Sequence, residues 1–180
     1  MLIVIYQNLG AAFLYLLLLS VVLLYIKEHG IIDTVQNVLD SLKDKHYRCK
    51  LYLCFWIIVI LLQTLLNREI WVYPLSNVIG IWGLFDEQGN YYTENIENFA
   101  LFLPYTITLL INLKQERFNL FQILKKTFLA SLGLSVVIEI CQLCFRVGTF
   151  QLSDLFFNTL GGTSGGLIYW IGHKVKHRKN

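Results

Sequence analysis

Long runs without any charged residue constrain this sequence more than any other feature. Such runs cover residues 2–26, 51–67, 99–113 and 155–172, and the run 127–145 contains a single acidic residue. A helix needs about 20 mainly apolar residues to cross a bilayer, so we expect the short run 99–113 to begin near Asn95. The sequence, which is 56% hydrophobic, therefore predicts an all-α, polytopic membrane bundle of about five transmembrane helices. We expect residues 1–180 to form a single membrane domain.

The basic residues predict an orientation for this bundle. Arg68 and Arg146 lie on one side of the predicted membrane, and all other members of the 15 lysines and arginines lie in segments 27–50, 114–126 and 174–179 on the opposite side. Loops rich in Lys and Arg stay in the cytoplasm. We therefore expect a multi-pass protein of the bacterial plasma membrane with an outer N-terminus and a cytoplasmic C-terminus. The net charge of +3 then reflects topology, and it requires no nucleic-acid partner.

Two segments outside the predicted spans have recognisable patterns. In the cytoplasmic segment 27–50, Val35, Val38 and Leu42 continue an apolar helical stripe, which predicts an amphipathic helix. That helix could lie on the inner membrane surface or dock on the spans. The extracytoplasmic loop 68–97 is rich in aromatic residues, and we expect a short helix over about 76–85 in it.

Polar residues interrupt the apolar character of the last two predicted spans. Glu139, Gln142 and Arg146 lie near one stripe of their helix, and Asp154 and Asn158 share a stripe of the next helix. Only a short connection joins these helices, so they should be antiparallel neighbours. We expect Glu139 to meet Asn158 at a similar depth, with Arg146 near Asp154 at an outward-facing mouth.

The cost of burying these groups favours a ligand site over a structural one. An ionisable side chain at the bilayer centre costs about 2.5–3.5 kcal/mol on insertion scales, whereas interhelical polar contacts contribute about 0.6 kcal/mol on average. A carboxylate, a guanidinium and two carboxamides would suit a polar or zwitterionic headgroup, a peptide end or a phosphate. The alternative is a hydrogen-bond lattice that only holds the helices together.

Glycine and proline mark expected sites of helix packing. The pairs Gly161/Gly165 and Gly162/Gly166 have the small-xxx-small spacing that allows close helix contact, within one chain or in a homodimer. Pro104 frees a backbone carbonyl near residue 100 in its own helix. The sequence contains no arrangement that we interpret as a metal site, and we predict no cofactor.

Taken together, the polar segments resemble the VanZ-like family of bacterial membrane proteins. The resemblance rests on Asn98 and Pro104 in one span, Ser135 followed by Glu139 and Gln142, then Arg146, and finally Asp154, Asn158 and the glycines 161, 162, 165 and 166. Arg68 with Tyr73-Pro-Leu is similar to an earlier Arg…Pro-Phe element, with Leu75 in place of the aromatic residue. A VanZ-like core over about 68–172 is thereby implied.

The resemblance implies a function in the cell envelope of Gram-positive bacteria, because the family takes its name from a member linked to teicoplanin resistance. We expect a protein that is non-catalytic or not demonstrably catalytic, whose partners are membrane lipids and a lipid-linked cell-wall precursor or a lipoglycopeptide, and which could thereby lower susceptibility to teicoplanin-type antibiotics. One alternative is an enzyme acting on an envelope lipid headgroup through Glu139, Asp154 and Arg146, although no triad is visible. Another is a small transporter or regulatory partner, in which a homodimer would supply further helices.

Overall fold

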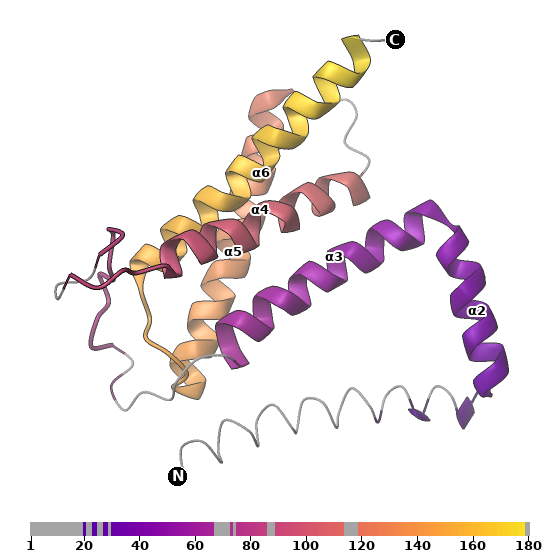
Figure 1. Ribbon diagram of the computed structural model, residues 1–180, viewed down its shortest axis with the longest axis horizontal. Helices are drawn as coiled ribbons and strands as arrows, with labels where there is room; N and C mark the ends of the chain where they lie inside the picture. Colours follow the sequence, from indigo (N-terminus) through magenta and orange to yellow (C-terminus); the bar gives the residue numbers. More distant parts are fainter. Residues whose placement is uncertain are drawn as a thin grey trace. The chain divides into compact units, whose positions relative to one another are not determined.

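The computed structural model describes residues 20, 23–24, 27–28, 30–66, 73, 75–85, 89–113 and 119–178. In order, its elements are α2 (Ile31–Lys43), α3 (Lys45–Leu61), the π-helical turn η1 (Leu62–Leu66), α4 (Glu94–Asn112), α5 (Leu120–Phe145) and α6 (Leu152–Arg178) (Figure 1). These residues contain no strand beyond one isolated bridge between Phe85 and Tyr91. The all-α prediction is therefore confirmed. The first expected span, 2–26, falls almost entirely outside the described residues.

The chain divides into two units, residues 1–51 and 52–180. In the first unit, α2 has the amphipathic pattern expected for the segment 27–50, and its apolar face is exposed, with Ile32 at 78% and Leu39 at 56%. Lys43 pairs with Asp40 at 2.7 Å on the polar face.

Local hydrogen bonds form at the junction between α2 and α3. The Asp44 carboxylate accepts hydrogen bonds from the backbone amides of His46 and Tyr47, at 3.1 and 3.2 Å. The His46 amide is the main cause that lowers the pKa of Asp44 below its usual value of 3.8. The Arg48 guanidinium donates to the last carbonyls of α2, at Leu42 and Lys43. These bonds satisfy backbone groups at the end of α2 and at the start of α3 that have no partner within their own helix.

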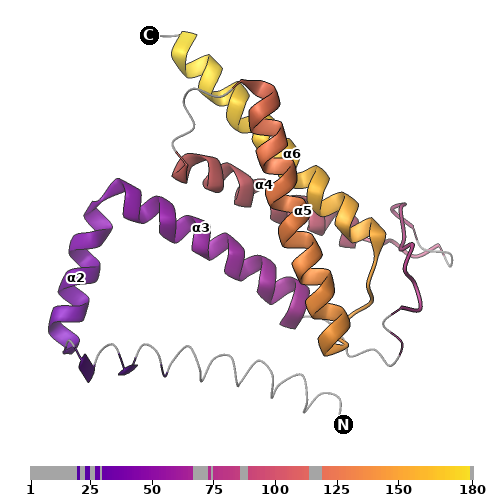
Figure 2. The ribbon, with the colours of Figure 1, turned by 180° about the vertical axis from the view of Figure 1, so that it is seen from behind.

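In the second unit, α6 lies between α4 and α5 (Figures 1 and 2). The glycines of α6 make this possible on two faces. A Cβ added at Gly161 or Gly165 would collide with the backbone of α4 at Phe99 or Leu103, and one added at Gly162 or Gly166 would collide with hydroxyl groups of α5. The glycine face is therefore occupied within the chain, so the homodimer considered above would need a different surface.

The ends of the helices agree with their sequence signals. Asn119 and Gln122 form a reciprocal capping box at the start of α5, at 2.9 and 3.1 Å. At its other end, α5 stops at Arg146, which has a left-handed backbone with φ of 55°. Helix α4 is uninterrupted at Pro104, which lies inside it.

Polar and apolar side chains in the second unit are distributed in the reverse of the usual way for a protein in water. Buried residues of α5 include Thr127, Ser131, Ser135, Glu139 and Gln142, whereas its exposed residues include large apolar side chains. Those exposed side chains are Phe128, Leu129, Val136, Val137, Ile140 and Leu143. An exposed apolar surface of this extent is expected where hydrocarbon is the solvent.

Two of the described helices are long and apolar enough to cross a membrane, Lys45–Leu65 and Leu120–Phe145. They correspond to the second and fourth runs expected from the sequence. Helices α4 and α6 coincide with the third and fifth runs, but Asn, Thr and Gly residues interrupt their apolar sequence.

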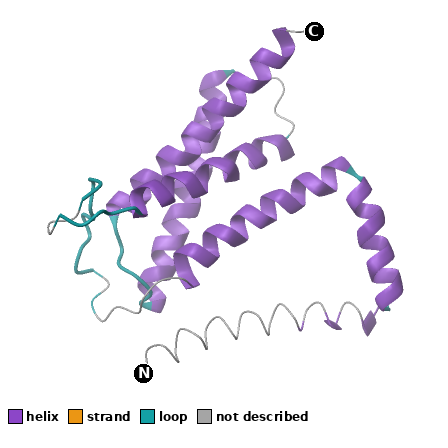
Figure 3. Ribbon diagram, in the orientation of Figure 1, coloured by secondary structure: helices purple, strands orange, loops and turns teal. Residues whose placement is uncertain are grey.

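The expected short helix over 76–85 is wrong. Figure 3 shows this segment as loop, and it contains turns and bends around Gly80, whose φ is 76°. The Asn95 side chain donates to the carbonyls of Ile81 and Gly83, at 2.8 and 3.1 Å. Those carbonyls therefore bond to a side chain of α4 instead of forming helical hydrogen bonds. A further bond from Leu152 N to Val78 O, 2.8 Å, fixes the loop to the start of α6.

Candidate functional site

The register between α5 and α6 determines which polar residues face each other. Asn158 Nδ2 donates to Ser135 Oγ at 2.9 Å. Further along, Gly162 packs on Ser131 and Gly166 on Thr127. Contacts therefore repeat every four residues, with numbers rising on α6 and falling on α5, as antiparallel helices require. By the same register, the residue four before Asn158, which is Asp154, lies at the level of the residue four after Ser135, which is Glu139. The same face of the two helices thus carries both carboxylates.

Both carboxylates are buried, with Glu139 1% and Asp154 3% exposed. Glu139 Oε2 accepts a 3.1 Å hydrogen bond from the backbone amide of Gln151, just before α6 begins. Two negative charges at one level of an apolar structure would repel each other and lose their hydration. Buried carboxylates therefore need partners that donate hydrogen bonds or carry positive charge.

Gln142 connects this region to η1. Its Nε2 donates to the Thr64 carbonyl at 2.8 Å, and Thr64 Oγ1 in turn donates to Ile60 O. A π-helical turn changes the usual i to i−4 pairing, and such turns are frequent at functional sites. Within the described part of the chain, Gln142 Oε1 has no hydrogen-bond partner although it is buried.

Helix α4 contributes two more buried amides. Since Gly161 faces Phe99 and Gly165 faces Leu103, α4 and α6 run in the same direction, and Asn158 lies near the level of Asn95 and Asn98. Asn98 Nδ2 and Asn158 Oδ1 are buried, and neither atom has a hydrogen-bond partner among the described residues. We call the buried stripe formed by Asn98, Ser135, Glu139, Gln142, Asp154 and Asn158 the polar seam.

The structure thus brings five of the sequence-predicted site residues into the polar seam, namely Asn98, Glu139, Gln142, Asp154 and Asn158. Arg146 is not among them. Its side chain is exposed, and no ion pair joins it to Asp154 in the described structure. The reason is the left-handed turn at Arg146, which ends the helical stripe. Asn158 binds Ser135 instead of meeting Glu139 directly, because Asp154 occupies that level. Arg68 lies outside the described residues.

The sequence did not lead us to Thr127, Ser131, Asn95 or Thr64 as site residues. Thr127 and Ser131 precede Ser135 and Glu139 at intervals of four residues on α5, and this spacing could have revealed the full stripe. Asn95 and Thr64 have no comparable signal, since each bonds to backbone carbonyls. Among the described residues, no group of three or more His, Cys, Asp or Glu side chains could hold a metal ion.

A helical, membrane-associated protein with a buried polar seam is the class that this fold and this site define. Comparison with known sequences identifies the family: the chain belongs to the VanZ/LLP1 family, which matches residues 12–173. It is also 34% identical over 95 residues to Protein VanZ of Enterococcus faecium. That match covers 53% of this chain and 55% of the relative, so the chain spans about half of the length of the curated protein it matches. No solved structure matches the chain.

Proposed function

We propose that this VanZ-family protein binds the polar head of a lipid-linked or lipophilic molecule at the polar seam, from the extracytoplasmic side. The observation that carries this proposal is the set of buried amide atoms without partners in the described structure, at Asn98, Gln142 and Asn158. Buried polar atoms in proteins are nearly always hydrogen-bonded. An incomplete set of donors and acceptors beside two carboxylates is suited to a ligand that supplies the missing bonds.

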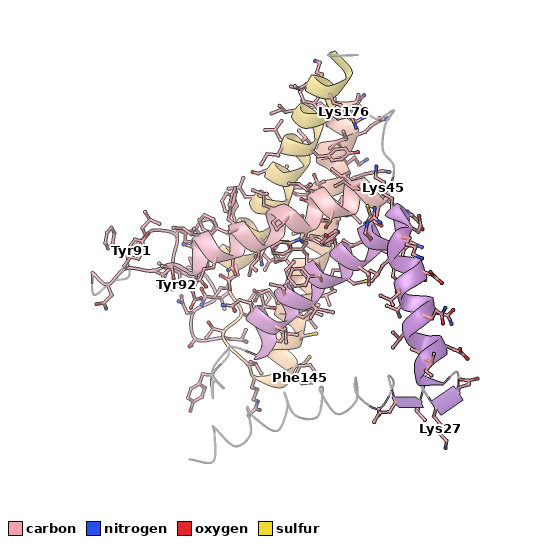
Figure 4. The ribbon with its side chains drawn as sticks, turned by 45° about the vertical axis from the view of Figure 1, so that its right-hand side comes forward. Lys27, Lys45, Tyr91, Tyr92, Phe145 and Lys176 are labelled. Carbon is pink, nitrogen blue, oxygen red and sulfur yellow. The ribbon has the colours of Figure 1, made fainter. Side chains whose placement is uncertain are left out.

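The proposal includes the topology expected from the sequence, with five spans, an outer N-terminus and a cytoplasmic C-terminus. The second unit is arranged consistently with it. Lys125 and Lys126 at the start of α5 and Lys174 and Lys176 at the end of α6 belong to the same end of the antiparallel pair. Figure 4 shows Tyr91 and Tyr92 at the end opposite Lys176. Basic residues at one end and aromatic rings at the other fit a cytoplasmic and an outer interface.

A lattice that only stabilises the bundle is the competing explanation for the polar seam. In a lattice, the amide atoms would be expected to satisfy one another, because an unpaired polar group in an apolar environment costs about 1–3 kcal/mol. Ser135 and Asn158 do form such a pair. The unpartnered atoms of Asn98, Gln142 and Asn158 favour a binding role for the remaining groups.

The test is a pair of charge-removing substitutions. Glu139→Gln combined with Asp154→Asn keeps the size of both side chains and removes both carboxylates. Purified protein in lipid nanodiscs should lose binding to a lipid-linked cell-wall precursor or to teicoplanin, and cells should lose any protection against teicoplanin. Glu97→Gln, which alters an exposed carboxylate on α4, is the matched control.

The double substitution could also leave binding and susceptibility unchanged while the protein remains at its normal level in the membrane. In that case the polar seam would be structural, and the proposal would be rejected. Teicoplanin and the precursor are tested separately, because they represent the two ligand sources that the same chemistry allows.

An enzyme acting on an envelope lipid headgroup is a second candidate. The observation that favours it is the placement of Glu139 and Asp154 at one level, since two buried carboxylates can divide acid and base roles. Arg146 is exposed and would contribute only at the rim. Mass spectrometry of envelope lipids incubated with the purified protein distinguishes the two functions: an enzyme changes the mass of a headgroup, and each single substitution abolishes that change.

A further inference from the structure

A groove of about 310 Å³ lies where α4 and α6 meet the loop that precedes α4. Its walls come from three segments: Trp82 in the loop, Asn95, Ile96 and Phe99 on α4, and Phe157 and Leu160 on α6. This volume is at the lower end of the range for ligand sites in proteins, about 300–1,000 Å³. Apart from Asn95, each of these six residues presents an apolar or aromatic side chain.

Trp82 gives the groove a fixed aromatic wall. Its ring lies 5.2 Å from Phe156 and 6.2 Å from Phe157, measured between ring centroids. Its indole nitrogen donates to Ile79 O at 3.1 Å. Because this polar atom is already bonded, the ring offers its apolar surface to an occupant.

Asn95 also lines the groove, and its hydrogen-bonding side chain is only partly satisfied. Its Nδ2 holds the loop carbonyls of Ile81 and Gly83. The residue is 3% exposed, and its Oδ1 has no hydrogen-bond partner within the described ranges. An acceptor of this kind in an apolar wall is suited to a single O–H or N–H group of a mainly apolar molecule.

Residues that line the groove are sequence neighbours of residues in the polar seam. Phe99 follows Asn98 on α4, and Phe157 precedes Asn158 on α6, so groove residues and seam residues alternate on the same turns. The groove and the seam therefore lie at one depth of the bundle. A molecule with an apolar chain and a polar head could contact both.

We propose that the groove binds the hydrocarbon chain of the amphiphile whose head occupies the polar seam; this inference rests on the function proposed above. A polypeptide segment is a poor alternative, since its backbone amides and carbonyls would be buried against Asn95 alone. A hydrocarbon chain has no such groups. A hydroxyl or amide group of the head would donate to Asn95 Oδ1.

The experiment uses the full chain in nanodiscs of phosphatidylglycerol that contain a small share of the same lipid with a photoactivatable diazirine in its acyl chain. After irradiation, mass spectrometry should find adducts concentrated on the peptides that contain Phe99 and Leu160. Leu160→Trp fills the groove and should lower labelling of the Phe99 peptide at least about threefold. Leu167→Trp is the matched control, because Leu160 and Leu167 are both on α6 and are 42% and 40% exposed.

A second substitution guards against a folding defect. Ile96→Trp fills the groove from the opposite wall, on α4, and should lower labelling of the Leu160 peptide equally. If the three tryptophan variants label alike, or if adducts are spread evenly over the exposed apolar positions, only surrounding lipid contacts these residues and the inference is wrong.

Failure of the groove and failure of the head site give different results. Glu139→Gln with Asp154→Asn tests the head site and leaves the groove unfilled. If Leu160→Trp changes neither the binding of the head nor the labelling of the Phe99 peptide, the assignment of the groove to the hydrocarbon chain is wrong and the head site is unaffected. Unchanged head binding in the double carboxylate variant would overturn the proposed head site alone.

Discussion

Asn158 Nδ2 on α6 donates a 2.9 Å hydrogen bond to Ser135 Oγ on α5, and both residues are almost completely buried. This contact fixes the register of the two helices at the point where the polar seam begins. One helical turn toward the start of α6, the same register brings Asp154 to the level of Glu139.

Ser135→Ala removes the acceptor of this bond and leaves Asn158 Nδ2 buried without it. We expect a loss of about 1 kcal/mol in the free energy of unfolding, since a buried unsatisfied group costs about 1–3 kcal/mol and membrane hydrogen bonds lie at the low end. Unfolding of the purified protein in mixed micelles by sodium dodecyl sulfate measures this change. Ser164→Ala, at a less buried position on α6, should have little effect. Equal effects of the two substitutions would contradict the register.

Gly162→Ala tests the packing of α6 on α5. The new Cβ would collide with Ser131 Oγ, so the helices must separate, and overpacking of this kind costs about 1–3 kcal/mol. Gly172→Ala is the control, because no described atom lies within 4 Å of a Cβ built at that position. There alanine should be neutral or stabilising by up to about 1 kcal/mol, owing to its better helix propensity. Thermal unfolding of both variants in detergent gives the comparison, and a stabilising Gly162→Ala would be incompatible with this packing.

The native cysteines offer a test of orientation. Cys144 is exposed in the last turn of α5, which is the outer end of that helix in our topology, whereas Cys49 lies near the first turn of α3 at the cytoplasmic end. In single-cysteine variants, a membrane-impermeant maleimide added to intact cells should label Cys144 and spare Cys49. Both should react after the cells are permeabilised. Labelling of Cys49 in intact cells would reverse the proposed orientation.

Asp44 is expected to make the start of α3 sensitive to acid. The His46 amide, which bonds its carboxylate, lowers the folded-state pKa below the usual 3.8, so the charged form favours the capped helix. Its stabilising contribution is therefore fully present above about pH 4 and is lost as the pH falls through the lowered pKa. Nuclear magnetic resonance of the His46 amide over this range should show a titration that Asp44→Asn abolishes. A titration midpoint above 3.8 would contradict the capping role.

The helical segments follow from the sequence because hydrocarbon permits only structures that satisfy their own backbone, and long uncharged runs then become helices. The Glu139–Gln142 stripe, the Asp154–Asn158 stripe and the glycine pairs were visible for the same reason, since helical spacing assigns residues to faces. The short helix expected over 76–85 was wrong because a single side chain, Asn95, binds the carbonyls that a helix would have used.

Tertiary structure alone decided which backbone groups the buried polar side chains bind. Gln142 binds the Thr64 carbonyl, Glu139 binds the Gln151 amide, and Thr106 binds the Gly162 carbonyl. Every residue except proline carries the same backbone donor and acceptor, so no sequence pattern marks which of them will be used. The sequence by itself determined which side chains share a face. The packing of α6 between α4 and α5 determined what each face meets, and the left-handed turn at Arg146 left that residue outside the seam.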